Sequence, residues 1–216
     1  RDQPRSRGLG DVYKRQPLTQ LADPYNMVLL YSNLYLDENI QLICHIVPEI
    51  KKFIFIGDAR QINQTNNLDI RNKLKKTHPN VEYQFITPQD MTTNQLLDSL
   101  YFVDPKTTGV LFSSWFYKTT FAGNTSLVSN AHKLIGTTAA PIFTLNMADI
   151  TEENGGMIGG YTYNQKHFNQ QLIHTIAEIL AGKQARDIPF YIPTDGAPII
   201  NYKILLRKLS LIHISE

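Results

Sequence analysis

The stretch that decides the fold is residues 155–208, which read GGMIGGYTYNQKHFNQQLIHTIAEILAGKQARDIPFYIPTDGAPIINYKILLRK. A glycine-rich strand ending in aromatic residues leads into an amphipathic helix with apolar residues at Phe168, Leu172, Ile176 and Ile179. Gly182 then ends that helix, because glycine readily adopts the backbone conformation found just past a helix C-terminus. A short β-rich run follows. This order of strand, helix and strand is typical of an α/β domain.

The same alternation runs through the residues upstream. Short apolar runs predict strands at residues 53–57, 81–86, 109–112 and 141–145, with a further strand at 25–31. Helical spacing of apolar residues predicts helices at 37–47, 70–76, 90–100 and 126–135. The spacings suit right-handed crossovers between parallel strands, so the predicted fold class is α/β with a parallel, Rossmann-like sheet.

The two ends of the chain are related to each other at the level of DNA. Residues 11–16 read DVYKRQ and residues 209–214 read LSLIHI, and codons exist that make one the reverse complement of the other. The DNA resembles the end sequence of a transposase used in library preparation. We therefore predict that residues 1–16 and 209–216 are adapter-derived and not native.

This prediction changes the charge of the protein. The two end segments hold five basic and three acidic residues, so the 21 basic and 19 acidic residues of the chain fall to 16 of each. The remaining protein is neutral, and its charge predicts no nucleic-acid partner and no attraction to a membrane surface. No apolar run approaches the roughly 18 residues of a membrane span.

Motifs for catalysis, metals and cofactors are absent from the sequence. The single cysteine, Cys44, excludes an internal disulfide and every cysteine-cluster metal site. The glycine pairs at 155–156 and 159–160 do not match a phosphate-binding loop, and a tight turn or close backbone approach explains them better. No zinc-binding histidine motif or nucleophile elbow occurs. We expect no metal, no cofactor and no enzymatic activity in this fragment.

Polar and aromatic residues follow the predicted strands. Ligands of open α/β sheets bind beyond the carboxyl ends of the strands. The predicted ligand-binding residues at these ends are Asp58, Ser113, Ser114, Trp115, Asn146 and Tyr163.

Each of these residues also has a structural interpretation. Trp115 either stacks on a ligand or packs in the core, and Asp58 either accepts ligand hydrogen bonds or caps a turn or helix. Ser113 and Ser114 either donate to a ligand or only form hydrogen bonds with backbone groups. Tyr163 belongs either to a pocket or to the core. Asp58 is the one charge expected among these residues, which favours a neutral or weakly charged polar ligand. Arg60 is close enough in sequence to Asp58 to count against that inference.

Residues 155–208, together with YSNLYLDENIQLI at 31–43 and NGGMIGGYTY at 154–163, resemble type I periplasmic-binding domains. The likeness is to ABC-transporter substrate-binding proteins and to the extracytoplasmic sensor domains of bacterial histidine kinases. It implies a first lobe truncated at its N-terminal side, with residues 17–36 leading into a hinge. Residues 37–163 would then form the second lobe, and residues 164–208 would return to the incomplete first lobe.

The resemblance also implies a function and a location. Its leading interpretation is binding of a small polar molecule between two lobes, as the sensor domain of a two-component histidine kinase. A substrate-binding lipoprotein of an ABC transporter is the alternative, and an α/β sugar- or nucleotide-processing enzyme is the alternative of another class. The protein would be periplasmic or otherwise extracytoplasmic, tethered to the membrane only through segments outside this sequence. Homodimer formation stays open.

Overall fold

A computed structural model describes residues 26–30, 34–116, 128–151, 156–191 and 194–213, with only the backbone described at 128–130 and 209–213. The chain divides into two compact units. The described residues of 34–162 and 197–213 form the first, which we call the sheet unit. The described residues of 163–196, together with residues 26–30, form the second. We call it the α7 unit, after helix α7 (Gln165–Leu180).

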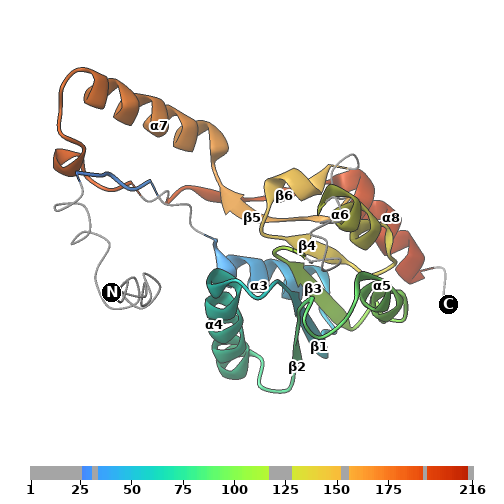
Figure 1. Cartoon of the computed structure of the whole chain (residues 1–216). Coiled ribbons are helices and arrows are strands. Elements are labelled where there is room, and N and C mark those ends of the chain that lie inside the picture. The colour runs from blue at the N-terminus through green and yellow to red at the C-terminus, as the bar shows by residue number, and fades with distance from the viewer. Residues whose placement is uncertain (1–25, 31–33, 117–127, 152–155, 192–193, 214–216) are drawn as a thin grey trace, which may run out of the picture. The chain divides into compact units, whose positions relative to one another are not determined.

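The sheet unit is built on a six-stranded sheet with the strand order β2-β1-β3-β4-β5-β6 (Figure 1). Neighbouring strands from β2 through to β5 run parallel. The strands are β1 (Lys52–Ile56), β2 (Glu82–Ile86), β3 (Thr108–Phe112), β4 (Ile142–Thr144), β5 (Gly159–Tyr163) and β6 (Gly196–Ile200). This arrangement confirms the predicted α/β fold with a parallel sheet.

Helices connect these strands and cover the sheet. They are α3 (Leu36–Ile46), α4 (Gln61–Thr77), α5 (Thr93–Tyr101), α6 (Val128–Thr137) and α8 (Tyr202–His213), with a short 3-10 helix η1 (Met147–Ile150). The strand predicted at 25–31 is wrong for the described residues 26–30, where Leu30 makes only an isolated bridge to Tyr191.

Alternating side chains of the central strands give the sheet two apolar faces. Phe53 and Phe55 of β1 pack in one cluster with residues of α3 and α4. Ile54 and Ile56 point to the opposite face and pack with residues of α5 and α6. Successive strand residues point to opposite faces, so a continuous FIFI run indicates a strand covered on both sides. The structure confirms this interpretation.

Helix α4 begins nine residues before the predicted helix. Its buried positions are Asn63, Asn66, Ile70 and Leu74, which have helical spacing. Asparagine occupies the first two of these positions, so an apolar periodicity is absent from the first half of the helix. The burial of Asn63 is important for the site described below.

Two glycines allow β4, β5 and β6 to approach one another closely. A Cβ atom at Gly160 would lie 2.0 Å from the carbonyl oxygen of Thr144, and one at Gly159 would lie 2.1 Å from that of Ile199. The amide of Asn39 in α3 both donates to the Tyr161 carbonyl and accepts from the Tyr161 N–H, at 2.9 and 2.8 Å. The prediction of close backbone approach is confirmed for these two glycines.

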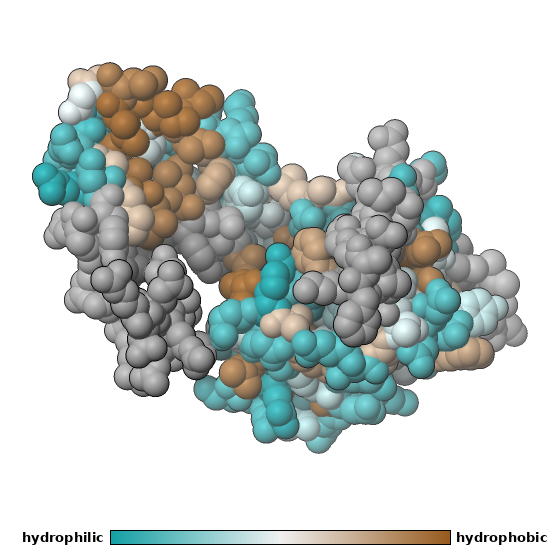
Figure 2. Space-filling view, viewed as in Figure 1, coloured by the Kyte–Doolittle hydropathy of each residue, from teal (hydrophilic) through white to brown (hydrophobic). Residues whose placement is uncertain are grey.

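The α7 unit is small and leaves an apolar surface exposed. Phe168 of α7 packs against the rings of Tyr163 and Tyr191, with centroids 5.2 and 6.2 Å away. Farther along the helix Ile173 and Leu180 are mostly exposed, and Figure 2 shows the apolar residues of α7 as one hydrophobic patch. Another part of a protein normally covers an apolar helix face of this kind. Among the helices of the described residues, none is both long and apolar enough to span a bilayer.

The structure divides the C-terminal residues between the two units in a way that the sequence does not predict. The sequence predicts that residues 164–208 return together to the first lobe. In the structure the described residues of 163–196 group with residues 26–30, whereas residues 197–208 belong to the sheet unit, because β6 extends the sheet beside β5. Helix α8 continues through residues 209–213 of the predicted adapter. Residues 1–16, the other predicted adapter segment, lie outside the described residues.

Candidate ligand-binding edge

Asp58 is the centre of a polar network at the carboxyl ends of β1 and β3. It follows β1 through Gly57 and is only 2% exposed. Its Oδ1 atom accepts from the Arg60 backbone N–H at 2.9 Å, from Arg60 Nε at 2.9 Å and from Asn63 Nδ2 at 2.8 Å. Its Oδ2 atom accepts from Arg60 Nε and from the Ser114 hydroxyl, both at 2.8 Å. Both carboxylate oxygens of Asp58 are therefore engaged inside the protein.

These contacts keep Asp58 ionised. Burial alone would raise the pKa of Asp58, because a carboxylate loses its hydration. The hydrogen bonds from Arg60, Ser114 and Asn63 outweigh that effect and hold the pKa below its usual value. We conclude that Asp58 is a fixed negative charge that orders its neighbours.

Asn63 connects the two strand ends. It is fully buried, and its amide nitrogen donates to Ser114 Oγ at 2.9 Å as well as to Asp58. Its amide oxygen accepts from the Ser113 hydroxyl at 2.7 Å. The predicted residues Asp58, Ser113 and Ser114 thus lie together, but they are joined by an asparagine that the sequence pattern did not single out.

Arg60 presents the network's positive charge to the outside. Its side chain is 54% exposed, although its Nε atom forms an ion pair with Asp58. Its Cζ atom also lies 4.3 Å from the centroid of the Phe116 ring, a cation–π contact. Among the described residues the terminal guanidinium nitrogens have no hydrogen-bond partner. A guanidinium held from two sides, with donors left over, is suited to binding a carboxylate or a similar acceptor.

Trp115 lies in the core and not on the surface of this edge. It is 1% exposed and belongs to the apolar cluster under α5 and α6. Its indole N–H donates to Thr93 Oγ1 at 3.0 Å. These contacts give Trp115 the packing role that the sequence left open, and its ring presents no accessible face for a ligand to stack on.

Asn146 and Tyr163 are not part of the network. Asn146 follows β4 at the same edge of the sheet and is exposed, and its side chain accepts from the Ala148 N–H at 3.3 Å, capping η1. Tyr163 packs against Phe168 in the α7 unit. Asn146 is accessible to a ligand, whereas Tyr163 is placed only within its own unit.

A buried His132–Asp149 pair lies near the end of β4 and was missed by the sequence analysis. His132 Nδ1 is 2.8 Å from Asp149 Oδ1, and the imidazole contacts the Phe112 ring edge-on at 4.8 Å. Asp149 Oδ2 also accepts from the Thr144 hydroxyl at 3.3 Å. The two partners are 17 residues apart in no known motif, so no sequence signal could have paired them. Within the described residues no group of three or more histidine, cysteine or acidic side chains could hold a metal ion.

Comparisons with known proteins identify the fold. Neither protein-family models nor curated protein sequences match the chain. Solved structures do match at the level of fold, at 13 to 14% sequence identity over 80 to 84% of this chain.

Three of these structures are similar over the larger part of this chain. A conserved domain protein from Vibrio cholerae has a TM-score of 0.58, with 56% of its length covered. A ligand-free, open substrate-binding protein with adhesive properties from Clostridium difficile has a TM-score of 0.53, with 55% covered. An ABC domain in complex with L-Trp from Streptococcus pneumonia has a TM-score of 0.54, with 56% covered. The chain therefore spans about half the length of these proteins, and it shares their α/β fold over that part.

Proposed function

We propose that this chain is part of an extracytoplasmic solute-binding protein that delivers a small polar molecule to an ABC transporter. The observation that carries the proposal is the Asp58–Arg60 network. A buried, fully bonded carboxylate holds one exposed guanidinium at the carboxyl-end edge of a parallel sheet. Ligands of such sheets bind at this edge.

The similar structures favour transport over signalling. They include a substrate-binding protein and an ABC domain in complex with L-Trp. Nothing among them supports the histidine-kinase sensor that was the leading interpretation of the sequence. We therefore adopt the alternative, a transport-associated binding protein, with attachment to the membrane through segments outside this sequence.

The chemistry of the edge indicates what the ligand carries. Arg60 offers its remaining guanidinium donors after the end of β1. Asn146 is exposed after the end of β4, two strands from β1 in the sheet, and adds an amide at the same edge. A planar guanidinium fork matches a carboxylate better than a hydroxyl. We propose a small molecule with one carboxylate, such as an amino acid, which is consistent with a weakly charged ligand.

The proposed role is binding without chemical conversion. Two buried groups near the ends of β1 and β4 that could act as acids or bases are committed to protein partners, Asp58 to Arg60, Asn63 and Ser114, and His132 to Asp149. A general base must reach the proton that it removes. The carboxylates of Asp58 and Asp149 are both almost completely buried, so a bound ligand does not reach them.

A ligand screen tests the proposal. Purified protein carrying this chain is mixed with the standard L-amino acids, other small carboxylates and neutral sugars, and thermal unfolding midpoints are recorded. Hits are confirmed by calorimetry, and NMR of the recovered ligand checks that it is unchanged. We expect a carboxylate to raise the midpoint, because a ligand that binds only the folded state stabilises it. A neutral sugar as the tightest ligand, or a chemically altered ligand, would contradict the proposal.

A further inference from the structure

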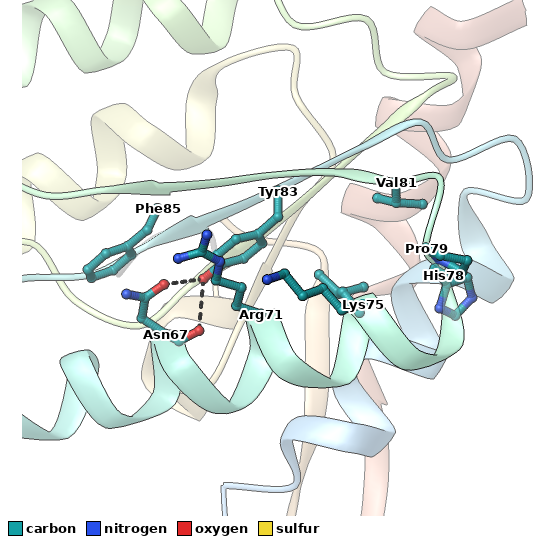
Figure 3. Close-up of a pocket in the computed structure, with 9 residues that line it drawn as sticks. Asn67, Arg71, Lys75, His78, Pro79, Val81, Tyr83 and Phe85 are labelled. Carbon is teal, nitrogen blue, oxygen red and sulfur yellow. Dashed lines mark hydrogen bonds between the residues drawn. The ribbon is translucent and has the colours of Figure 1, made fainter.

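A pocket lies on the sheet unit between α4 and the edge strand β2. It has a volume of about 480 Å³ and is lined on its polar and aromatic sides by Asn67, Arg71, Lys75, His78, Tyr83 and Phe85. Figure 3 shows these side chains between the helix and the strand. Arg71 follows Arg60 by eleven residues, about 16 Å along the helix axis. The pocket is therefore separate from the carboxyl-end edge.

The position of β2 explains why the pocket exists. β2 is the outermost strand of the sheet, and residues 81, 83 and 85 lie on the same face of it. Helix α4 covers this face only in part, leaving the rings of Tyr83 and Phe85 as one wall. The Phe85 ring is supported from behind by Phe55, stacked at 5.2 Å.

The Tyr83 ring is held in one orientation. Its hydroxyl donates to Asn67 Oδ1 at 2.7 Å, one turn of α4 before Arg71. Burial raises the pKa of Tyr83, and the nearby positive charge of Arg71 only partly opposes this. The hydroxyl therefore stays protonated at neutral pH and remains a donor to Asn67.

The lining is basic and contains no carboxylate. Arg71, Lys75 and His78 supply nitrogen donors, and no aspartate or glutamate lines the pocket. Among the described residues neither Arg71 nor Lys75 has an ion-pair partner, whereas Lys73 on the same helix pairs with Asp37. Basic residues in a last helical turn also interact favourably with the helix dipole. Arg71 lies before that turn, so the dipole does not account for it.

We propose that this pocket binds a small aromatic carboxylate. Arg71 and Lys75 contact the carboxylate, and the Tyr83 and Phe85 rings contact the flat apolar part. The volume lies within the range of small-molecule sites, roughly 300 to 1,000 Å³. A guanidinium fork fits a carboxylate, and aromatic walls favour a flat ring. The site is independent of the proposed transport ligand and would add an accessory ligand to the protein.

The test uses 2-naphthoate as the probe and calorimetry on the full chain. We expect saturable binding that weakens with added salt, because exposed charges are screened. 2-Naphthylmethanol keeps the ring system and lacks the charge, and it should bind at least about tenfold more weakly. Arg71→Gln should weaken naphthoate binding by a similar factor, while Lys76→Gln, an exposed lysine outside the pocket, should leave it unchanged.

Several outcomes would overturn the proposal. These are no binding of naphthoate at millimolar concentration, equal binding of naphthoate and naphthylmethanol, or unchanged binding in Arg71→Gln. Loss in Arg60→Gln with retention in Arg71→Gln would place the probe at the carboxyl-end edge and also overturn it. Inorganic phosphate binding as tightly as naphthoate would remove the role of the rings. If Arg71→Gln lowers the unfolding midpoint, Lys75→Gln takes its place, with the same expected loss.

Discussion

Replacing Asp58 by asparagine should destabilise the sheet unit by about 3 kcal/mol. The substitution preserves the shape of the side chain but replaces one acceptor oxygen by a donating NH₂ group. At the Oδ1 position that group would face three donors, namely two from Arg60 and one from Asn63. At Oδ2 it would face Arg60 Nε and the Ser114 hydroxyl, which can turn to accept. The second orientation costs less and still loses one or two hydrogen bonds of a charged group, each worth about 1.5 to 3 kcal/mol.

Urea unfolding followed by circular dichroism measures this loss. Asp98→Asn is the matched control, because Asp98 is exposed on α5, and it should change the free energy of unfolding by less than about 0.5 kcal/mol. A loss below about 1 kcal/mol for Asp58→Asn would refute the inference that the carboxylate holds the network together.

The pH dependence of the same measurement provides a second test. The folded-state pKa of Asp58 lies below its usual value, so its ionised form stabilises the fold at pH values above the unfolded pKa of about 3.9. That contribution is lost as pH falls through the lower, folded-state pKa. The difference between parent and Asp58→Asn should therefore stay constant from about pH 5 to 8 and shrink below about pH 4. A difference that grows in acid would contradict the sign of the shift.

Three further predictions concern single residues of the sheet unit. Trp115→Phe should lower the free energy of unfolding by about 1 to 2 kcal/mol, because the hydrogen bond to Thr93 and some packing are lost. Ligand affinity measured by calorimetry should stay unchanged, and a selective loss of affinity would show that the Trp115 ring stacks on the ligand. Burial lowers the pKa of Lys208 from 10.5 to about 8, so the unfolded chain binds more protons between these values and the free energy of unfolding should rise with pH there. Lys208→Met should remove that rise in urea titrations. Gly160→Ala should destabilise the protein by about 3 kcal/mol or prevent folding, because its Cβ atom would meet the Thr144 carbonyl at 2.0 Å; a normal thermal midpoint would rule out this close approach.

The strands could be predicted from sequence because each carries its own signal. The FIFI run of β1 is apolar on both faces, and it is buried on both faces in the structure. Helix α4 shows where such signals fail. Its first two buried positions are asparagines, which hold polar partners and break the apolar period.

The sequence predicts where residues of the candidate site lie, but it does not predict the hydrogen bonds that join them. The rule about strand ends selected Asp58, Ser113 and Ser114, which do lie together. It could not show that Asn63 joins Ser113 and Ser114 to Asp58, since hydrogen bonds between residues about 50 apart depend on the folded geometry. The same rule selected Trp115, whose ring turns into the core, because strand-end position does not fix the direction of a side chain.

The central claim is that Arg60, held by Asp58, binds the carboxylate of a small solute. Calorimetry with the best ligand from the screen and with its amide analogue, on parent, Arg60→Gln and Lys76→Gln proteins, tests it most directly. The account predicts that Arg60→Gln weakens carboxylate binding by roughly 10- to 100-fold, the loss of a charge-assisted bidentate contact, and removes the preference for carboxylate over amide. Lys76→Gln should bind as the parent does. Retention of the full carboxylate preference in a folded Arg60→Gln protein would contradict the claim.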